Sequence, residues 1–379
     1  MKTKKVLAGF MAASLAAVSL TGCLGSTVAT TAAAPETTAA AAEQKETQAE
    51  EAKAEETAAA ETSAAADMKY SFNPDNIGEH VFTLSTTATT GSALSDVTNN
   101  FAQRVSDLSG GKMTVDVFEG SALGSEAQNL EALTAGTLDM AIIAVEFYVN
   151  SIPQVGALIL PYMYDDYDQV QKVLESEAGE YASEQLLNVA KVKNLGYYVM
   201  AFRNMYTKKE IKSVDDLAGL KMRVPESSLY VDTFRMMGAA PTPLSSSEVY
   251  TALDTGVVEG FENTADSCLH MSIFEVAPYF NVTRHLNAPT TFSMSDMVFE
   301  KLNEDEQNLL LEAGYEASHY GLESTKTSDE NYQNELKEKG MTFVETDVES
   351  MRAKIDYNAY DFMKSEEAQK LFELVKANR

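Results

Sequence analysis

Two different periods of apolar and polar positions alternate between residues 80 and 286. Short apolar stretches rich in β-forming residues are separated by longer stretches in which apolar residues recur every three or four positions. The predicted strands are residues 80–84, 113–118, 140–145, 195–202, 220–224 and 280–286. Because strands alternate with helices along the chain, we expect a fold of the α/β class.

Helix-start signals mark several of the intervening segments. Ser125 is followed three residues later by Gln128, and Ser245 by Glu248, which is the capping-box pattern. Helical periodicity also covers residues 166–190, 227–238 and 264–276. From residue 303 to residue 340 the pattern is helical almost without interruption. A single small lobe could not bury a helix of that length, so we expect it to run along or between two lobes.

The start of the chain is patterned differently. Three lysines at positions 2, 4 and 5 precede an uncharged apolar run over residues 6–20, which leads into the tetrapeptide LTGC ending at Cys23. The run is shorter than the roughly 20 residues of a membrane-spanning helix, and small residues before a cysteine are typical of lipoprotein signal peptides. We therefore predict a lipoprotein signal peptide at residues 1–22 and acylation of Cys23, with an ordinary secretory signal as the alternative.

Residues 24–67 consist almost wholly of Ala, Thr, Glu, Ser, Gln and Lys and contain no aromatic side chain. Such a segment has too little apolar surface to build or join a core. We expect residues 23–76 to be the acylated cysteine with a disordered tether, and residues 77–379 to be the folded domain. The only other cysteine is Cys268, so the fold must rest on its core and not on an internal disulfide.

The charge of the chain narrows the choice of partners. Lysine and arginine number 29 against 57 aspartates and glutamates, which gives a net charge of −28. A polyanion is repelled by nucleic acid and by anionic lipid, so we expect no nucleic-acid partner and membrane contact only through the lipid anchor. An anionic small ligand stays possible, because a local group of arginines acts at short range.

The motifs of common catalytic sites are missing from the sequence. The four histidines are scattered without metal-ligand spacing, and there is no nucleophile elbow, phosphate-binding loop or dinucleotide fingerprint. Cys268 lies in an apolar helical pattern, where a buried small hydrophobe is more common than a nucleophile. We therefore predict a protein that is not an enzyme and that uses no metal or cofactor. A surface hydrolase is the alternative from another class.

Two arginines lie within apolar, strand-like sequence, Arg203 after LGYYVMAF and Arg223 inside LKMRVP. A guanidinium keeps its charge and is costly to bury unpaired, so each needs an anionic partner or a solvated cleft. That partner could be a carboxylate of the protein, as in an internal ion pair, or the carboxylate of a ligand. Their position near predicted strand ends, where clefts form in α/β folds, favours a ligand.

Two further polar residues have similarly open interpretations. Asn263 stands between a turn-like segment and a predicted helix, where it could cap the helix or bind a ligand. Glu126 stands in the first turn of a predicted helix, a position that favours negative charge in any case. Neither residue identifies a site by itself.

Three runs of sequence resemble one protein family when taken together. They are SGGKMTVDVFEGSALGSEAQNLEALTAGTLDMAI, IKSVDDLAGLKMRVPE and MGAAPTPLSSSEVYTALDTGVVEGFEN, and they occur in the family's order. The family is that of the DctP-type solute-binding proteins of TRAP transporters. The resemblance covers about residues 79–379 and implies a two-lobed fold like that of periplasmic binding proteins, with a hinge, a central cleft and a long helix that spans the lobes.

The resemblance also implies how the chain divides between the lobes. Lobe 1 would hold about residues 77–200 and 288–325, and lobe 2 about residues 201–287 and 326–379. The cleft would then lie between the two sets of residues, with the hinge where the chain crosses from one lobe to the other.

The resemblance further implies a set of ligand-binding residues. Arg223 matches the family arginine that forms a salt bridge with the ligand carboxylate, Arg203 a second pocket arginine, and Asn263 a ligand-contacting asparagine. Glu126 falls where several members contact ligand hydroxyls. The remaining expected site residues are Glu226, Ser246 and Thr290. Ser246 and Glu226 replace residues of sialic-acid-binding members, which argues against sialic acid as the ligand, and contacts from residues 85–90 are not assigned singly.

The function implied is capture of an organic acid anion outside the cytoplasm and its delivery to the membrane subunits of a TRAP permease. The ligand would be a sugar acid such as a uronate, or a C4-dicarboxylate. A binding lipoprotein of an ABC or chemosensory system is the alternative within binding proteins. We expect a monomer anchored to the outer face of the cell membrane through Cys23, in an envelope of the Gram-positive type.

Overall fold

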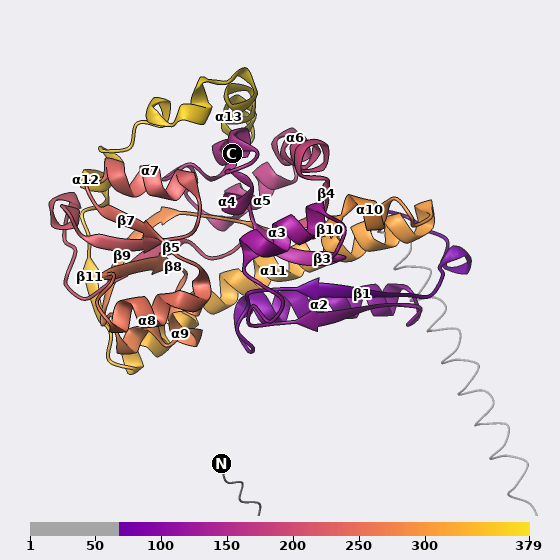
Figure 1. The fold of residues 1–379 in the computed structure, drawn as a ribbon, viewed down its shortest axis with the longest axis horizontal. Coiled ribbons are helices and arrows are strands. Elements are labelled where there is room, and N and C mark those ends of the chain that lie inside the picture. The colour runs from indigo at the N-terminus through magenta and orange to yellow at the C-terminus, as the bar shows by residue number, and fades with distance from the viewer. Residues whose placement is uncertain (1–67) are drawn as a thin grey trace, which may run out of the picture. The chain divides into compact units, whose positions relative to one another are not determined.

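Two β-sheets organise the computed structural model, which describes residues 68–379 (Figure 1). Sheet A has the strand order β2-β1-β3-β10-β4 and sheet B the order β11-β9-β5-β8-β6-β7. The strands of sheet A are β1 His80–Ser85, β2 Met113–Phe118, β3 Met140–Ala144, β4 Val192–Tyr198 and β10 Thr290–Ser295. The strands of sheet B are β5 Arg203–Thr207, β6 Lys221–Val224, β7 Ala240–Pro243, β8 Gly260–Asn263, β9 Tyr279–Leu286 and β11 Thr342–Glu345.

Helices pack around both sheets, and each sheet with its helices is one lobe. The α-helices are α2 Ala93–Leu108, α3 Glu126–Thr134, α4 Val145–Tyr148, α5 Tyr167–Leu174, α6 Glu177–Gln185, α7 Ser228–Met236, α8 Val249–Asp254, α9 Ala265–His270, α10 Asp296–Phe299, α11 Glu304–Glu338, α12 Val348–Arg352 and α13 Glu366–Asn378. Shorter turns of helix include η2 Pro153–Ile159 and η5 Ser246–Glu248. We call the sheet A half lobe 1 and the sheet B half lobe 2. The predicted two-lobed α/β fold is confirmed.

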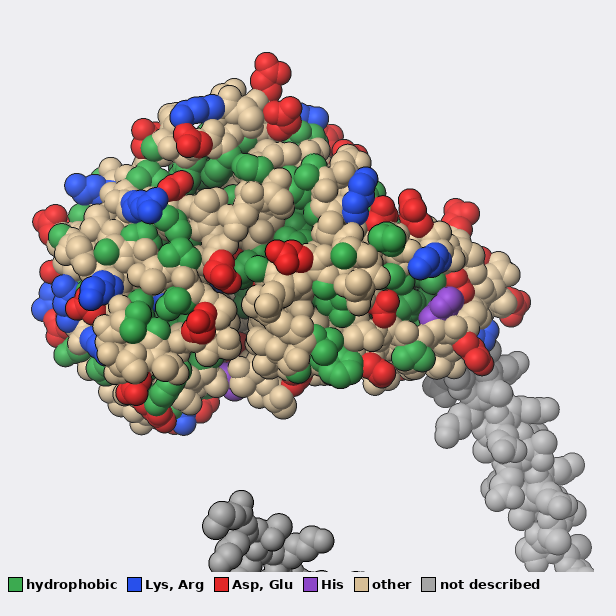
Figure 2. Space-filling model, viewed as in Figure 1, with side chains coloured by type: hydrophobic (Ala, Val, Ile, Leu, Met, Phe, Trp, Pro, Cys, Tyr) green, Lys and Arg blue, Asp and Glu red, His purple; other side chains and the backbone are tan. Residues whose placement is uncertain are grey.

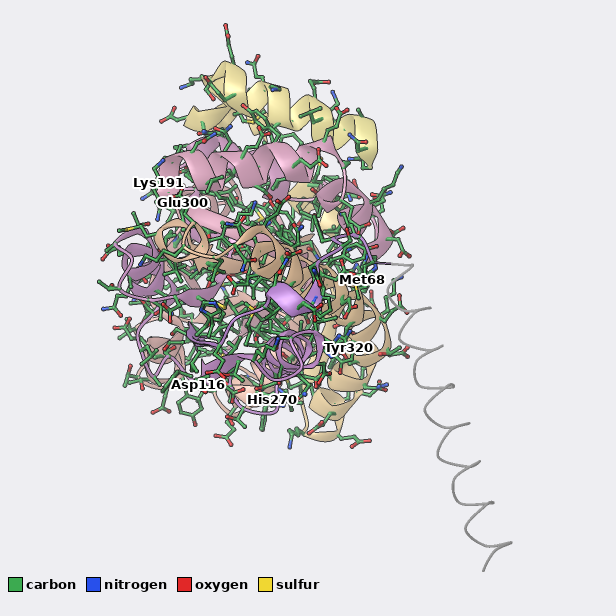
Figure 3. The ribbon with its side chains drawn as sticks, turned by 90° about the vertical axis from the view of Figure 1, so that its right-hand side faces the viewer. Met68, Asp116, Lys191, His270, Glu300 and Tyr320 are labelled. Atoms are coloured by element: carbon green, nitrogen blue, oxygen red, sulfur yellow. The ribbon has the colours of Figure 1, made fainter. Side chains whose placement is uncertain are left out.

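The chain passes between the lobes in three places. It crosses from β4 to β5, from β9 to β10, and within α11, which contacts α2 and β4 of lobe 1 and α9 of lobe 2. Tyr320 of α11, labelled in Figure 3, donates a hydrogen bond of 2.7 Å to Asp96 of α2. The long helix that spans both lobes is therefore present as predicted.

The predicted strand at residues 195–202 is wrong in its second half. β4 ends at Tyr198, and the next strand begins at Arg203 in the other sheet. Residues 199–202 are nonetheless at most 8% exposed, because they are buried where the chain crosses between the lobes. Asn287 in the neighbouring crossing donates a hydrogen bond of 2.6 Å to the carbonyl oxygen of Met200. The apolar run in the sequence thus extends past the end of β4, which is why the predicted strand was too long.

The start of the folded domain also differs from the prediction. Residues 69–76 are not part of a tether, because they lie on α11. Tyr70 N donates to Glu312 at 2.7 Å, and Asn73 N donates to Asp305 at 2.7 Å. Phe72 also packs against the apolar core of lobe 1, so the folded domain begins before residue 77. The predicted signal peptide, Cys23 and residues 24–67 lie outside the described residues.

The C-terminal residues divide between the lobes. β11 pairs with β9 in sheet B, but α13 packs against η2 and α6 of lobe 1. The expected assignment of all residues 326–379 to lobe 2 therefore does not hold for α13. Within residues 68–379 no helix has both the length and the hydropathy that a membrane span needs. Acidic side chains are spread over the visible face of both lobes (Figure 2).

Candidate ligand-binding site

A cavity lies between the two lobes, with an empty volume of about 670 Å³ when counted out to its mouth. Its walls come from the segment after β1, from α3 and α4 of lobe 1, and from β5, β6, η5, β8 and α9 of lobe 2. Six of the seven predicted ligand-binding residues line it together: Glu126, Arg203, Arg223, Ser246, Asn263 and Thr290. Glu226 does not, and instead lines an adjoining hollow with Gly124 and Ser245.

Hydrogen bonds join the two lobes beside this cavity. Ala93 N, in the first turn of α2, donates to a carboxylate oxygen of Asp266 in α9 at 3.2 Å. On another side, Asn150 donates to the carbonyl oxygen of Glu226 at 2.6 Å and accepts from Ser228 N at 3.0 Å. The walls of the cavity are thus held together by polar contacts that an opening of the lobes would break.

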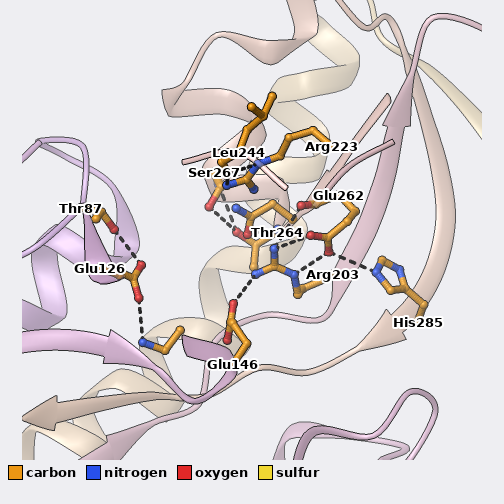
Figure 4. A network of polar contacts seen from close by, with 12 residues as sticks. Thr87, Glu126, Glu146, Arg203, Arg223, Leu244, Glu262, Thr264, Ser267 and His285 are labelled. Carbon is orange, nitrogen blue, oxygen red and sulfur yellow. Dashed lines mark hydrogen bonds and ion pairs between the residues drawn. The ribbon is translucent and has the colours of Figure 1, made fainter. Parts of the chain in front are cut away.

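Arg223, within β6, has a charge that no carboxylate of the described chain neutralises by direct contact. Its side chain is buried at 3% exposure. Nε and Nη2 both donate to the carbonyl oxygen of Leu244, at 2.9 and 2.5 Å (Figure 4), and the ring of Phe261 lies 5.8 Å away. Burial lowers the pKa of Arg223 to about 10, so the guanidinium stays charged at neutral pH.

Arg203, at the start of β5, has a full internal partner. Its Nε and Nη2 donate to the two carboxylate oxygens of Glu262 at 2.7 and 2.8 Å, and Nη2 also donates to the Glu262 carbonyl at 3.1 Å. Burial alone would lower the pKa of Arg203, but Glu262 raises it well above its ordinary value. The ring of Tyr230 lies 5.2 Å from this guanidinium. The ion pair with Glu262 therefore neutralises most of the charge of Arg203.

The counter-ion of Arg203 is itself held in place. His285 Nε2 donates to a carboxylate oxygen of Glu262 at 3.2 Å, and its Nδ1 accepts from the Thr283 hydroxyl at 2.9 Å. Burial would raise the pKa of Glu262, but the contacts with Arg203 and His285 lower it overall. Burial lowers the pKa of His285. A buried carboxylate thus faces a guanidinium on one side and a neutral imidazole on the other.

Glu126 is fixed on the lobe 1 wall by two donors. The Thr87 hydroxyl donates to it at 3.0 Å and Ala144 N at 2.8 Å. Its helix, α3, begins with the predicted capping box of Ser125 and Gln128. Burial raises the pKa of Glu126, against the effect of these hydrogen bonds. Thr87 is the residue of the unassigned segment 85–90 that meets a predicted site residue.

Glu146 of α4 is a cavity residue that the sequence analysis missed. It is 2% exposed, its Oε1 lies 3.7 Å from Arg203 Nη1, and its Oε2 has no hydrogen-bond donor among residues 68–379. Burial raises the pKa of Glu146 to about 8. A lone carboxyl in the apolar run MAIIAVEFYV was the available signal, of the kind that singled out the two arginines.

The remaining predicted residues contribute neutral polar groups. Asn263 does not cap α9, because Thr264 is the N-cap residue. The Oδ1 of Asn263 accepts a hydrogen bond from Thr264 N at 2.9 Å. Its Nδ2 has no hydrogen bond to the described residues. The Thr290 hydroxyl is buried and also lacks a partner within residues 68–379. Ser246 belongs to η5, and its hydroxyl lies 3.9 Å from the sulfur of Met271.

Three other features of the described residues are weaker candidates for a functional site. A second hollow, with an empty volume of about 1160 Å³ counted in the same way, lies on lobe 1 between α6, β4 and α11, and no arginine lines it. Across residues 68–379, no group of three or more His, Cys, Asp or Glu side chains is placed to hold a metal ion. Cys268 is fully buried among apolar side chains, as its sequence context predicted.

Comparison with known proteins agrees with this geometry. The family model described as bacterial extracellular solute-binding protein, family 7 (DctP), matches residues 84–366. A solute-binding protein of Roseobacter denitrificans is 34% identical over 256 residues, which are 67% of this chain and 78% of that protein.

Solved structures are similar over most of the chain. A TRAP periplasmic solute-binding protein from Roseobacter denitrificans with bound L-galactonate has a TM-score of 0.73 and 30% identity, and covers 79% of this chain and 99% of its own. One from a Bradyrhizobium species with bound galacturonate has a TM-score of 0.75 and 29% identity, and covers 78% and 99%. The chain therefore belongs to family 7 of the bacterial extracellular solute-binding proteins, the DctP family.

Proposed function

We propose that this protein is the solute-binding protein of a TRAP transporter and that it captures an organic acid anion between its lobes. The observation that carries the proposal is the environment of Arg223. A guanidinium that is 3% exposed and bonded only to a carbonyl oxygen is a buried cation in need of an anion. The similar proteins with bound sugar acids support an organic acid as that anion.

The geometry of Arg223 suits a carboxylate. A guanidinium has five N–H donors in a planar fork, and Leu244 takes one from Nε and one from Nη2. The end formed by Nη1 and the second N–H of Nη2 is left unused. That end presents two parallel donors, which is the arrangement that binds the two oxygens of a carboxylate.

Closure of the lobes provides the transport mechanism. Because the cavity takes walls from both lobes, a ligand that touches both binds the closed form more tightly than the open form. Its binding then shifts the population towards closure about the crossings of the chain, and the closed form would be the one delivered to the membrane subunits of the permease.

The test is calorimetric titration of the purified protein with D-galacturonate, D-galactonate, succinate and L-malate. Replacing Arg223 by Ala removes the charged partner and is expected to weaken binding of any bound acid by about 100-fold or more. Arg235→Ala is the matched control, because that arginine is 66% exposed on α7, and it is expected to leave affinity unchanged. An acid that binds wild type and Arg223→Ala equally well would contradict the proposal.

Family membership narrows the alternatives. The chain belongs to a family of solute-binding proteins, so it is a binding protein and not an enzyme. The similar structures of TRAP solute-binding proteins favour a TRAP permease over an ABC or chemosensory partner. Within organic acids, both a sugar acid and a C4-dicarboxylate carry the carboxylate that Arg223 requires.

The attachment to the membrane is a separate proposal. The LTGC motif supports acylation of Cys23, which would hold the domain outside the cytoplasm on a tether. A Gram-positive type of envelope and a monomeric state stay predictions. Metabolic labelling with a fatty acid tests the anchor, and Cys23→Ala is expected to abolish the label; labelling that persists in this variant would contradict it.

A further inference from the structure

Glu146 faces the cavity from lobe 1, where Arg203 lies within ion-pair distance of its Oε1 but makes no hydrogen bond with it. Its carboxyl group is 2% exposed, and no donor among the described residues reaches Oε2. Thr290, in β10 of the same lobe, also lines the cavity and has a buried hydroxyl without a hydrogen bond. Buried polar atoms in folded proteins nearly always have partners. Two unpartnered groups in one cavity wall therefore indicate atoms that a ligand satisfies.

The nearest cation does not supply that partner. Arg203 Nη1 lies 3.7 Å from Glu146 Oε1, which is beyond hydrogen-bond length. The guanidinium already bonds both carboxylate oxygens of Glu262, at 2.7 and 2.8 Å. Its charge is thus largely neutralised before Glu146 is considered. A buried carboxyl beside a neutralised ion pair is more stable with its proton than without it.

The other charged groups around Glu146 do not change this conclusion. The ionisable groups that act on it or line the same cavity are Glu126 on α3, Arg203 on β5, Arg223 on β6, Tyr230 on α7, Glu262 on β8, and Asp266 with His270 on α9. Glu126 and Glu262 oppose ionisation of Glu146, and Arg203 favours it. Burial outweighs Arg203, so the pKa of Glu146 is raised to about 8.

We propose that Glu146 and Thr290 form the lobe 1 half of the ligand site, where the proton-bearing carboxyl of Glu146 exchanges hydrogen bonds with a hydroxyl group of the bound acid. This inference rests on the proposed function, because Arg223 must hold the carboxylate at the other end. A carboxyl group with its proton both donates and accepts, as a hydroxyl group does, so the two groups are complementary.

The same wall selects against a second negative charge. Glu126 lies in it with a carboxyl that already accepts two hydrogen bonds. The second carboxylate of a C4-dicarboxylate would lie beside this group and would meet like charge. A hydroxylated end meets acceptors and donors that it can use. Glu146 is therefore a residue that determines specificity for a hydroxylated monoacid over a plain dicarboxylate.

Affinity is then expected to depend on pH in a defined direction. Below pH 8 Glu146 carries its proton and binding is strong. Above pH 8 the free protein loses that proton and places an anion beside an anionic ligand, so affinity falls. Binding at pH 8 should take up about half a proton per ligand, because the bound form retains the proton that half of the free molecules have lost.

The experiment measures calorimetric affinity for D-galacturonate and succinate from pH 6.5 to 9, in buffers of different ionisation enthalpy. Wild type is expected to lose about tenfold in galacturonate affinity between pH 7 and pH 9 and to take up protons at pH 8. Glu146→Gln keeps the shape of the group without a titrating proton, so it should bind within about threefold of wild type at pH 6.5 and show neither effect. Glu300→Gln, at an exposed position of lobe 1 outside the cavity, is the control and should keep both effects.

Shortening the side chains of Glu146 and Thr290 tests whether they contact the ligand. Glu146→Ala and Thr290→Val should each weaken galacturonate binding, Glu146→Ala by about tenfold, and neither should weaken binding of succinate by as much. If both variants bind galacturonate as wild type does while Arg223→Ala has lost binding, this inference is overturned and the proposed function stands. If Arg223→Ala binds every acid as well as wild type, the proposed function is overturned and this inference with it. Unfolding transitions of each variant confirm that it is folded.

Discussion

Arg203 and Arg223 lie on strands of the same sheet and line the same cavity, yet their surroundings are opposite. Arg203 bonds the carboxylate of Glu262 at two points, whereas Arg223 bonds one backbone carbonyl. The contrast teaches that a buried arginine is assigned by its partners and not by its residue type. The guanidinium of Arg203 has a structural partner within the protein, and that of Arg223 is available to a ligand.

Strand register explains the contrast. In β8, Glu262 is the register partner of Met205, which shares a face of the sheet with Arg203, while Phe261 is the register partner of Arg223. Successive side chains on a strand point to opposite faces. Glu262 therefore points towards Arg203, and the neighbour Phe261 points towards Arg223. A shift of one residue in β8 would exchange the two environments.

The largest effect is expected from removing the counter-ion of Arg203. Glu262→Gln leaves Arg203 buried without its carboxylate, and breaking a buried ion pair in this way costs about 3–5 kcal/mol of unfolding free energy. Denaturant unfolding measures the change. Glu300→Gln, at an exposed position of lobe 1, is the control and is expected to change stability little. A loss below about 1 kcal/mol for Glu262→Gln would show that Arg203 does not depend on Glu262.

Replacing each arginine by lysine keeps the charge and separates the structural role of Arg203 from the proposed ligand-binding role of Arg223. Lysine lacks the planar end that can hold two carboxylate oxygens, so Arg223→Lys is expected to weaken ligand binding by about 30-fold, or roughly 2 kcal/mol, while unfolding free energy changes by less than about 1 kcal/mol. Arg203→Lys should show the reverse balance, with the larger effect on stability. Calorimetry and denaturant unfolding of both variants decide the matter. Equal losses of stability in the two variants would remove the distinction.

Much of the fold was predictable because its signals are local. The capping box at Ser125 and the long helical stretch after Asn303 both form as expected. Two of the strands that were not predicted, β7 and β8, lack a clear local signal. β7 contains Pro241 and Pro243, which argue against a strand, and they are tolerated because β7 lies at the edge of sheet B. The four residues of β8 are too few to show a period.

Most residues of the site could be predicted from the sequence, but the contacts among them could not. The sequence brought Arg203 and Arg223 forward on the same grounds, and both do line the cavity. Pairing of Arg203 with Glu262 depends on contacts between strands that are 59 positions apart in the chain. Glu226 is separated from the other site residues, because the chain turns away into α7 directly after it. These facts follow from tertiary register, which no local pattern encodes.

A third change tests whether Arg203 is already neutralised. The pKa of Glu146 is raised from 4.5 to about 8, so the folded protein holds a proton that the unfolded chain releases, and this group makes stability fall as pH rises from about 4.5 to 8. Glu146→Gln removes that cost and is expected to raise unfolding free energy at pH 8 by at least about 1 kcal/mol. Denaturant unfolding from pH 5 to pH 8 measures it. If Arg203 were free to pair with Glu146, the variant would be destabilised instead.

The smallest expected effect comes from the residue behind the ion pair. Since the pKa of His285 is lowered by burial, the unfolded chain binds more protons at this residue than the folded protein does. Its contribution is complete above the unfolded pKa of about 6.5 and is lost as pH falls below it. His285→Gln is expected to lower stability by about 1 kcal/mol at pH 7.5, through the lost hydrogen bond to Glu262, and to make stability less sensitive to pH between 6.5 and 5. Because His285 does not contact Arg223 or line the cavity, affinity for the ligand should be unchanged. A variant that loses affinity but keeps the wild-type slope with pH would place His285 in the ligand site and not behind Arg203.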